Sequence, residues 1–173
     1  MKSKAAATLL ATTILMAMPA AGEYVTAMSG LVIRDGPGTE FEQVGLLGFA
    51  DEVEGEITDG WMKIKNGYVS ADYLSEDNPL DDCQNLGSWL LTAYGWTGNR
   101  CADGSWPEVG WSVATNSLPL GSMVYVSGYG LKKITDRGPS NMPSCWLDIY
   151  LENEQACVEF GEKNLEVYLL STP

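Results

Sequence analysis

The sequence predicts a mainly β protein built from two small barrels and one short helix. Three observations lead to this fold class. Short apolar runs between residues 24 and 74 are separated by Gly and Asp-Gly turns, at the spacing of a small all-β unit. An acidic, proline-interrupted segment follows at 76–85, where neither a helix nor a core can form. Beyond this linker, strand-like runs resume and a single helical pattern occurs.

The first 22 residues have the layout of a secretory signal peptide. Two lysines precede an apolar stretch from Ala5 to about Ala17, and small residues follow up to Gly22. A membrane anchor is disfavoured because the apolar run is shorter than the ~20 residues that a bilayer requires. No cysteine lies near the expected cleavage point, which argues against a lipid anchor. We therefore expect a mature protein that is secreted, periplasmic or associated with the cell wall.

The composition limits both the chemistry and the partners. The chain contains no His, so triads that rely on imidazole are excluded and acid–base work falls to carboxylates, Tyr or Lys. No cysteine pair has zinc-ligand spacing, and we expect neither a metal nor a cofactor. Loss of the two signal-peptide lysines leaves 8 basic against 23 acidic residues, a net charge near −15. Such a charge repels phosphate backbones and argues against nucleic acid as a partner.

The four cysteines are Cys83, Cys101, Cys145 and Cys157, and none precedes the linker. An even number of cysteines in an exported protein favours two disulfides, with three possible pairings. Four buried free thiols are the alternative.

Residues 23–75 contain, in order, LVIRDGPGTEFEQVGLL, GFADEVEGEI, DGWMKIKNGYV and SADYLS. These motifs resemble the bacterial SH3 domain family. The resemblance implies a compact SH3-like barrel that docks onto cell-wall peptides or glycans, with Phe41 and Tyr73 as contact candidates. A spacer or packing module is the alternative. Trp61 is expected in the core of this barrel.

Residues 86–173 are expected to form a second β-barrel with one small helix. Asn153 has the character of a helix N-cap, acidic residues follow it, and Gly161 marks the end of the helix. The run EVYLL is expected to be the closing strand. Turn positions that require positive φ are expected at four glycines: Gly121, Gly128, Gly130 and Gly138.

This half carries CADGSWPEVGWSVATNSLPLGSMVYVSGYG, ITDRGP, WLDIYLENEQACVEFG and VYLL. It is similar to the 3D (three-aspartate) domain, a branch of the double-psi β-barrel family that includes the C-terminal barrel of certain lytic transglycosylases. Asp136 matches the second aspartate of the family pattern, and the resemblance makes it a candidate catalytic residue together with Asp148. Asp148 matches the third, which is the catalytic acid of the related transglycosylases. Asn116 stands where the first aspartate is expected.

A lytic transglycosylase can work with one carboxyl, because the nucleophile is the C6 hydroxyl of the muramic acid itself. Asp148 lies inside an apolar run, where partial desolvation would raise its pKa and Asp136 would add like-charge repulsion. A nearby Arg137 guanidinium would have the opposite effect. The alternatives are an ion pair of either aspartate with Arg137, or a strand whose outer face is wet.

Other residues are candidate substrate contacts. The resemblance places Thr92 and Tyr94 on a strand that lines the groove, although either one could instead be core or surface. Asn116 could hold a sugar hydroxyl or acetamide through its amide, and Arg137 lies beside it in the expected groove. Three tryptophans could stack on pyranose faces: Trp96, Trp106 and Trp111. For a tryptophan flanked by glycine, such as Trp111, packing is the commoner role.

The same resemblance suggests the disulfide pairs Cys101–Cys145 and Cys83–Cys157. Together these features predict an exported peptidoglycan-active enzyme. It would cleave the β-1,4 bond between N-acetylmuramic acid and N-acetylglucosamine, and the first barrel would hold it on the wall. One alternative is a non-catalytic binder of glycan strands or stem peptides, in which Asn116 marks lost activity. Another is hydrolysis of a different polysaccharide.

Overall fold

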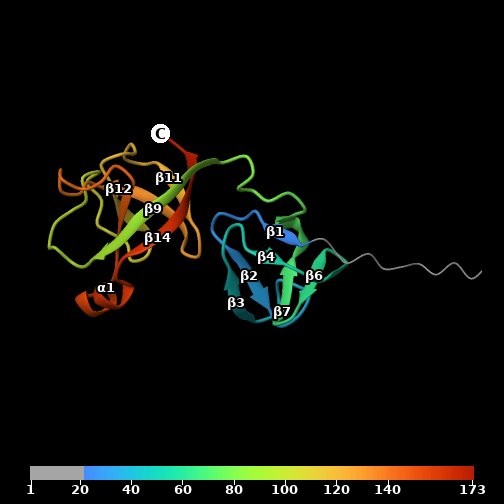
Figure 1. Ribbon diagram of the computed structural model, residues 1–173. Helices are drawn as coiled ribbons and strands as arrows, with labels where there is room; N and C mark the ends of the chain where they lie inside the picture. Colours follow the sequence, from blue (N-terminus) through green and yellow to red (C-terminus); the bar gives the residue numbers. More distant parts are fainter. Residues whose placement is uncertain (1–21) are drawn as a thin grey trace, which may run out of the picture.

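The computed structural model describes residues 22–173, and the expected signal peptide lies outside them except for its last residue. Figure 1 shows two units side by side, joined by a single stretch of chain. The described chain is mainly β, as predicted, and contains one α-helix. Within that part, no helix is long and apolar enough to cross a membrane.

The first unit contains eight short strands and one 3₁₀ turn. β1 (Glu23–Val25), β4 (Glu52–Val53) and β8 (Leu74–Ser75) form a three-stranded sheet in the order β4-β1-β8. A second sheet has the order β3-β2-β7-β6-β5. Its strands are β2 (Leu31–Arg34), β3 (Gln43–Leu47), β5 (Glu56–Thr58), β6 (Trp61–Ile64) and β7 (Gly67–Ser70), and the 3₁₀ turn is Ala71–Tyr73.

Side chains from both sheets form the core of the first unit. Ile33 of β2, Met62 of β6 and Val69 of β7 are buried together. The expectation that Trp61 belongs to this core was wrong. Alternation along β6 turns Met62 inward, so Trp61 faces outward and is only half-buried.

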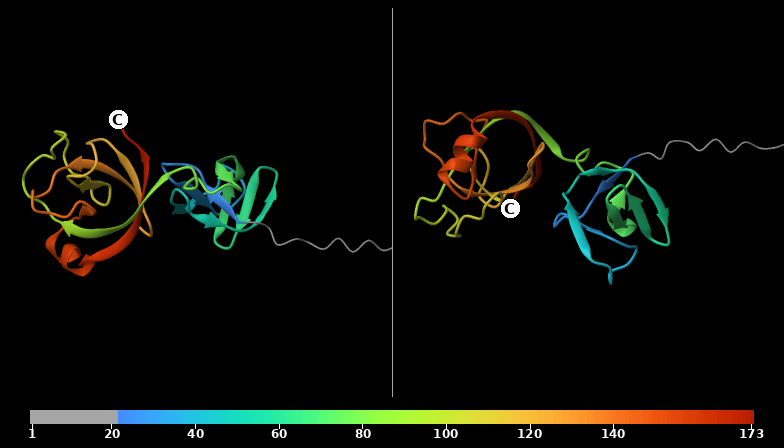
Figure 2. Two further views of the ribbon diagram at one scale, coloured as in Figure 1. Left: turned by 45° about the horizontal axis from the view of Figure 1, so that its top comes forward. Right: turned by 90° about the horizontal axis from the view of Figure 1, so that it is seen from below.

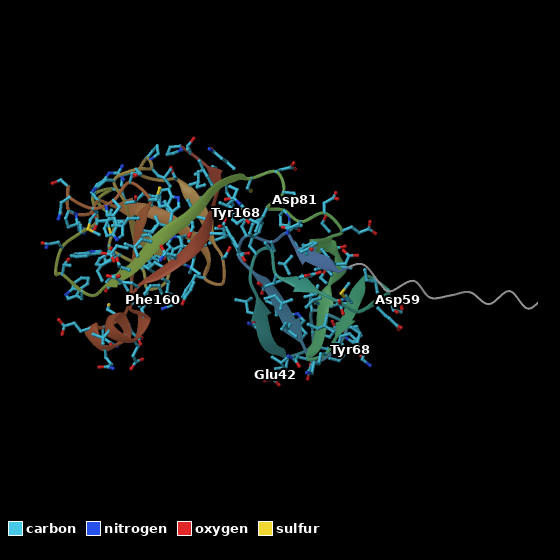
Figure 3. The ribbon with its side chains drawn as sticks, viewed as in Figure 1. Glu42, Asp59, Tyr68, Asp81, Phe160 and Tyr168 are labelled. Atoms are coloured by element: carbon cyan, nitrogen blue, oxygen red, sulfur yellow. The ribbon has the colours of Figure 1, made fainter. Side chains whose placement is uncertain are left out.

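The connecting segment is short and made of turns. Cys83 N donates to Leu80 O, and β9 (Gln84–Tyr94) begins at the next residue. The strand therefore starts inside the 76–85 segment that the sequence indicated as the linker. The units touch where the rings of Phe49 and Tyr125 lie 6.3 Å apart between centroids. Tyr168, labelled in Figure 3, packs against the same Tyr125 ring, also with 6.3 Å between the ring centroids.

The second unit is a closed barrel of six strands in the order β10-β12-β11-β14-β9-β13. The right-hand view of Figure 2 looks into this barrel. β10 pairs with β12 and β13 pairs with β9 in parallel, whereas the other neighbours are antiparallel. The remaining strands are β10 (Ser112–Ala114), β11 (Met123–Val126), β12 (Gly130–Asp136), β13 (Trp146–Tyr150) and β14 (Lys163–Ser171).

The barrel interior is filled by alternate residues of its strands, as period-two patterning requires. Fully buried residues that meet there include Leu91, Val113, Ile134, Leu147 and Ile149. The intervening residues of the same strands therefore face outward from the barrel.

The single helix, α1 (Glu154–Phe160), was predicted correctly at both ends. The Asn153 side chain accepts a hydrogen bond from Ala156 N at 2.9 Å, which makes it the N-cap. Gly161 ends the helix with φ of 62°.

Three of the four expected turn glycines, Gly121, Gly128 and Gly130, have positive φ. The fourth prediction, Gly138, was wrong because its φ is not positive. A Cβ atom at Gly138 would instead overlap the indole of Trp146. Glycine is therefore needed here for close approach of the backbone to a ring.

The predicted disulfides are absent from the structure, in which all four cysteines are free. Cys83 immediately precedes β9, whereas the Cys157 thiol lies close to Gly95, just beyond its other end. An extended strand of this length spans on the order of 30 Å, and a disulfide requires Cα atoms within about 7 Å. Cys83 and Cys157 therefore cannot be joined in this fold. Cys101 is buried and Cys145 is exposed.

Candidate active site on the outer face of the barrel

Four neighbouring strands bring the candidate residues to one level of the barrel wall. A β-bulge at Thr135 of β12 brings Asp136 into pairing with Ala114 of β10, so Asp136 shares the face of Ala114 although Ile134 belongs to the core. Ala114 is paired with Asp148 of β13, and Asp148 with Thr92 of β9. Residues that are directly paired across strands share a face of the sheet. Asp136, Ala114, Asp148 and Thr92 therefore form one row across the wall.

This row faces away from the barrel interior. Leu147 and Ile149 belong to the buried core, so Asp148 between them points outward. The run WLDIY is thus an alternating strand, with Trp146, Asp148 and Tyr150 on the outer face. Trp146 and Tyr150 are themselves buried, with exposed fractions of 2% and 6%. Asp148 sits between two buried aromatic residues and remains partly exposed.

A directed chain of hydrogen bonds ends at Asp148. Trp146 Nε1 donates to Thr92 Oγ1 at 3.0 Å, and Thr92 Oγ1 donates to Asp148 Oδ1 at 2.5 Å. An indole N–H can only donate and an ionised carboxylate can only accept, so Thr92 Oγ1 accepts from Trp146 and gives its one hydroxyl hydrogen to Asp148. One carboxyl oxygen of Asp148 is therefore fixed as an acceptor.

Burial raises the pKa of Asp148 above its ordinary value, and the hydrogen bond from Thr92 lowers it in part. Two expected influences do not contribute: like-charge repulsion by Asp136 and attraction by Arg137. The Arg137 guanidinium donates through Nη1 to Thr115 O at 2.6 Å and to Leu118 O at 2.9 Å. These bonds hold the guanidinium on backbone carbonyls, and among residues 22–173 the Asp148 carboxyl has no cationic partner.

Asp136 has a different environment from Asp148. Its Oδ1 accepts hydrogen bonds from Ala102 N at 2.9 Å and from Arg137 N at 2.8 Å. Ala102 belongs to the loop between β9 and β10, so Asp136 anchors that loop to the end of β12. One intervening strand separates it from Asp148, which puts the two backbones roughly 10 Å apart.

Asn116 connects two loops. Its Nδ2 donates to Pro139 O at 2.9 Å, and its Oδ1 accepts from Gly138 N at 3.2 Å. Both ends of the amide are therefore used in binding the loop after β12 to the loop after β10. Arg137 joins the same two loops. The structure thus gives both predicted substrate contacts a part in loop structure.

Tyr94 lies two residues after Thr92 in β9, so both side chains are on the same face of the sheet. Its ring packs on Tyr150 with centroids 5.3 Å apart. The hydroxyl is buried and has no hydrogen-bond partner among the described residues. Burial strongly raises the Tyr94 pKa, and the neighbouring Cys101, Asp136 and Asp148 side chains raise it further. Tyr94 is therefore a neutral phenol with an unused donor near the acids.

Trp146, whose indole N–H donates to Thr92, was not among the predicted site residues. Its signal was the alternation of Trp146, Asp148 and Tyr150 in one strand, which places an acid between two aromatic residues on one face. The anchoring of Asp136 by the backbone of Ala102 had no sequence signal. Within residues 22–173, no group of three or more His, Cys, Asp or Glu side chains could hold a metal ion.

The first unit carries a separate surface cavity of about 560 Å³, lined by residues that include Arg34, Trp61 and Tyr73. A neighbouring cavity of about 410 Å³ shares Trp61 and Asp59 with it and also includes Tyr68. Asp59 and Tyr68 are labelled in Figure 3. Tyr73, predicted as a contact residue, is 51% exposed in this cavity. Phe41 is also exposed, and its backbone carbonyl accepts a hydrogen bond from Arg34 Nη1.

Comparison of the chain with protein-family models, with curated proteins and with solved structures finds no match.

Proposed function

We propose that this protein is an exported, peptidoglycan-active enzyme that cleaves the MurNAc–GlcNAc β-1,4 bond in the manner of a lytic transglycosylase. The observation that carries the proposal is the environment of Asp148. This acid is partly exposed on the outer face, its pKa is raised by burial, and it has no cationic partner in the described part of the chain. A carboxyl that keeps its proton toward neutral pH can act as a general acid.

The reaction requires one such acid. Asp148 gives its proton to the glycosidic oxygen as the bond from this oxygen to C1 of muramic acid breaks. The resulting carboxylate then accepts the proton of the C6 hydroxyl as that oxygen bonds to C1. The product is a 1,6-anhydro sugar, no water is consumed, and Asp148 ends protonated as it began.

The architecture is compatible with the family resemblances on which this proposal also rests. A closed six-stranded barrel that contains two parallel strand pairs is the arrangement expected of a double-psi β-barrel. The two small sheets around one core in the first unit are compatible with an SH3-like barrel. We propose that this first unit binds the wall, which raises the local substrate concentration by tethering.

Digestion of purified peptidoglycan in water enriched in ¹⁸O tests the proposal. The wild-type mature protein should release 1,6-anhydromuropeptides that carry no solvent oxygen, and Asp148→Asn should release none. Asp136→Asn is the matched control, because an amide oxygen can still accept the two backbone hydrogen bonds and activity should persist. Equal release by wild type and Asp148→Asn would reject the proposal, as would products with labelled reducing ends.

A non-catalytic wall binder is the second candidate function. It is favoured by the cavity on the first unit, where Tyr73 and Trp61 present aromatic surface to solvent. In this case the protein would be retained on isolated sacculi, and no anhydro or reducing ends would appear. Tyr73→Ala would then weaken retention, whereas Asp148→Asn would not.

A further inference from the structure

The loop between β9 and β10, residues 95–111, presents an exposed pair of tryptophans. The rings of Trp96 and Trp106 have centroids 5.4 Å apart and are inclined by 31°. Trp96 is 59% exposed and Trp106 is 47% exposed. Indoles are large apolar groups whose exposure to water is unfavourable. An exposed cluster of this kind is a candidate binding surface.

The pair is held in place by its own loop. The Arg100 guanidinium carbon lies 4.5 Å from the centroid of the Trp106 ring, and Arg100 Nη1 donates to Gly104 O at 2.9 Å. Backbone hydrogen bonds between Cys101 and Ser105 and between Gly104 and Cys101 close the loop. Trp106 is therefore engaged by both neighbours, and the more exposed ring of Trp96 remains available.

The loop is also fixed relative to the candidate active site. Ala102 N donates to Asp136 Oδ1 at 2.9 Å, and Asp103 N donates to Thr135 O at 3.0 Å. Between Arg100 and Ala102, the side chain of Cys101 is buried next to the Tyr94 hydroxyl. The aromatic pair therefore has a defined position beside the row that contains Asp148.

We infer that Trp96, braced by Trp106 and Arg100, is a sugar-binding subsite that stacks on one pyranose ring of an N-acetylated glycan strand. This inference rests on the proposed function and names a subsite for its substrate. A pyranose has an apolar C–H face that suits an indole and a polar rim that needs hydrogen bonds. The exposed side chains of Thr97 and Asn99 follow Trp96 in the same loop and can bind that rim through the Thr97 hydroxyl hydrogen and the Asn99 amide oxygen. The net charge of −13 disfavours a polyanionic ligand.

Calorimetric titration with the hexamer of N-acetylglucosamine tests the subsite. The full mature chain is used with Tyr73→Ala as background, which removes an aromatic contact from the cavity of the first unit. Trp96→Ala should weaken binding about tenfold, and Trp96→Phe should remain within about threefold of the parent because a ring is kept. Val158→Ala is the matched control, since it removes an exposed apolar side chain from α1 and should leave affinity unchanged.

Several outcomes would overturn the subsite. These are no binding by the parent protein, equal affinity for Trp96→Ala and the parent, or a parent dimer in sedimentation that Trp96→Ala dissociates. Thermal unfolding of each variant shows whether a lost affinity reflects lost folding. The subsite and the proposed activity fail separately. If binding depends on Trp96 but no product forms, the subsite is retained and the proposed enzyme is rejected. If product forms but Trp96→Ala binds as tightly as the parent, the enzyme is retained and the subsite is rejected.

Discussion

Thr92 and Asp148 face each other across two parallel strands, and the Thr92 hydroxyl donates to Asp148 Oδ1 at 2.5 Å. The ionised Asp148 carboxylate can only accept, so the Thr92 hydroxyl accepts from Trp146 Nε1 and gives its hydrogen to Asp148. When the protonated acid keeps this bond, Oδ1 remains the acceptor and the transferable proton lies on Oδ2. Trp146 thus acts through Thr92 as a positioning residue.

Thr92→Val should remove both hydrogen bonds of this chain, the one from Trp146 to Thr92 and the one from Thr92 to Asp148. The change leaves the buried Trp146 Nε1 without its acceptor and should lower the free energy of unfolding by about 1–3 kcal/mol. It also removes the bond that lowers the Asp148 pKa, so the loss of activity with rising pH should shift to higher pH. Thr92→Ser should restore both properties. Urea unfolding and a pH–rate profile measure them, and unchanged values for Thr92→Val would contradict the arrangement.

Gly138→Ala should disturb the site from a distance. A methyl group at this position would overlap the Trp146 indole, so either the loop or the ring must move. Overpacking of this kind costs about 1–3 kcal/mol of stability. Near-ultraviolet circular dichroism should report the changed tryptophan environment. Ser140→Ala, an exposed position in the same loop, is the control and should behave as wild type. A Gly138→Ala protein as stable as wild type would show that the contact is not tight.

Asn116→Asp restores the acid of the family pattern, yet it should not improve the protein. An aspartate can still accept from Gly138 N, but it cannot donate to Pro139 O and would place a carboxylate against that carbonyl. We expect a loss of about 1 kcal/mol or more in unfolding free energy and no gain in glycan cleavage. Urea unfolding and the digestion assay measure these effects. A variant that is both more stable and more active would mean that the loop connection is dispensable.

Asp148→Asn should be more stable than wild type at pH 7 and equal to it near pH 3. A folded-state pKa above the ordinary 3.8 means that the folded protein binds this proton more tightly than the unfolded chain. Wild-type stability is therefore lost as pH rises from 3.8 through the folded-state pKa, and the amide variant has no such loss. Thermal unfolding over pH 3–8 measures the difference. A stability difference between Asp148→Asn and wild type that grows toward acid pH would contradict a raised Asp148 pKa.

Sequence patterns predicted the elements of the second barrel better than the contacts of its site. The helix ends were predictable because an N-cap and a C-terminal glycine act locally at Asn153 and Gly161. The outward direction of Asp148 was available from strand alternation. Its hydrogen bond from Thr92 depends on the pairing of β9 with β13, which joins residues 56 positions apart. Long-range register of this kind has no local signal.

The same limit explains the errors. The disulfide pairs were inferred from cysteine number and resemblance, but the length of β9 keeps Cys83 away from Cys157. Arg137 was expected to act on a carboxyl because of its charge. Its guanidinium instead binds the carbonyls of Thr115 and Leu118, groups that every residue carries and that no composition reveals.

The most direct test of the central claim is a titration of the Asp148 carboxyl carbon by NMR in the folded protein, with Asp148→Asn to assign the signal. The account predicts a midpoint above the ordinary 3.8 that moves higher still in Thr92→Val. A midpoint at or below 3.8 would contradict it, because Asp148 would then be ionised too early to donate a proton to a glycosidic oxygen.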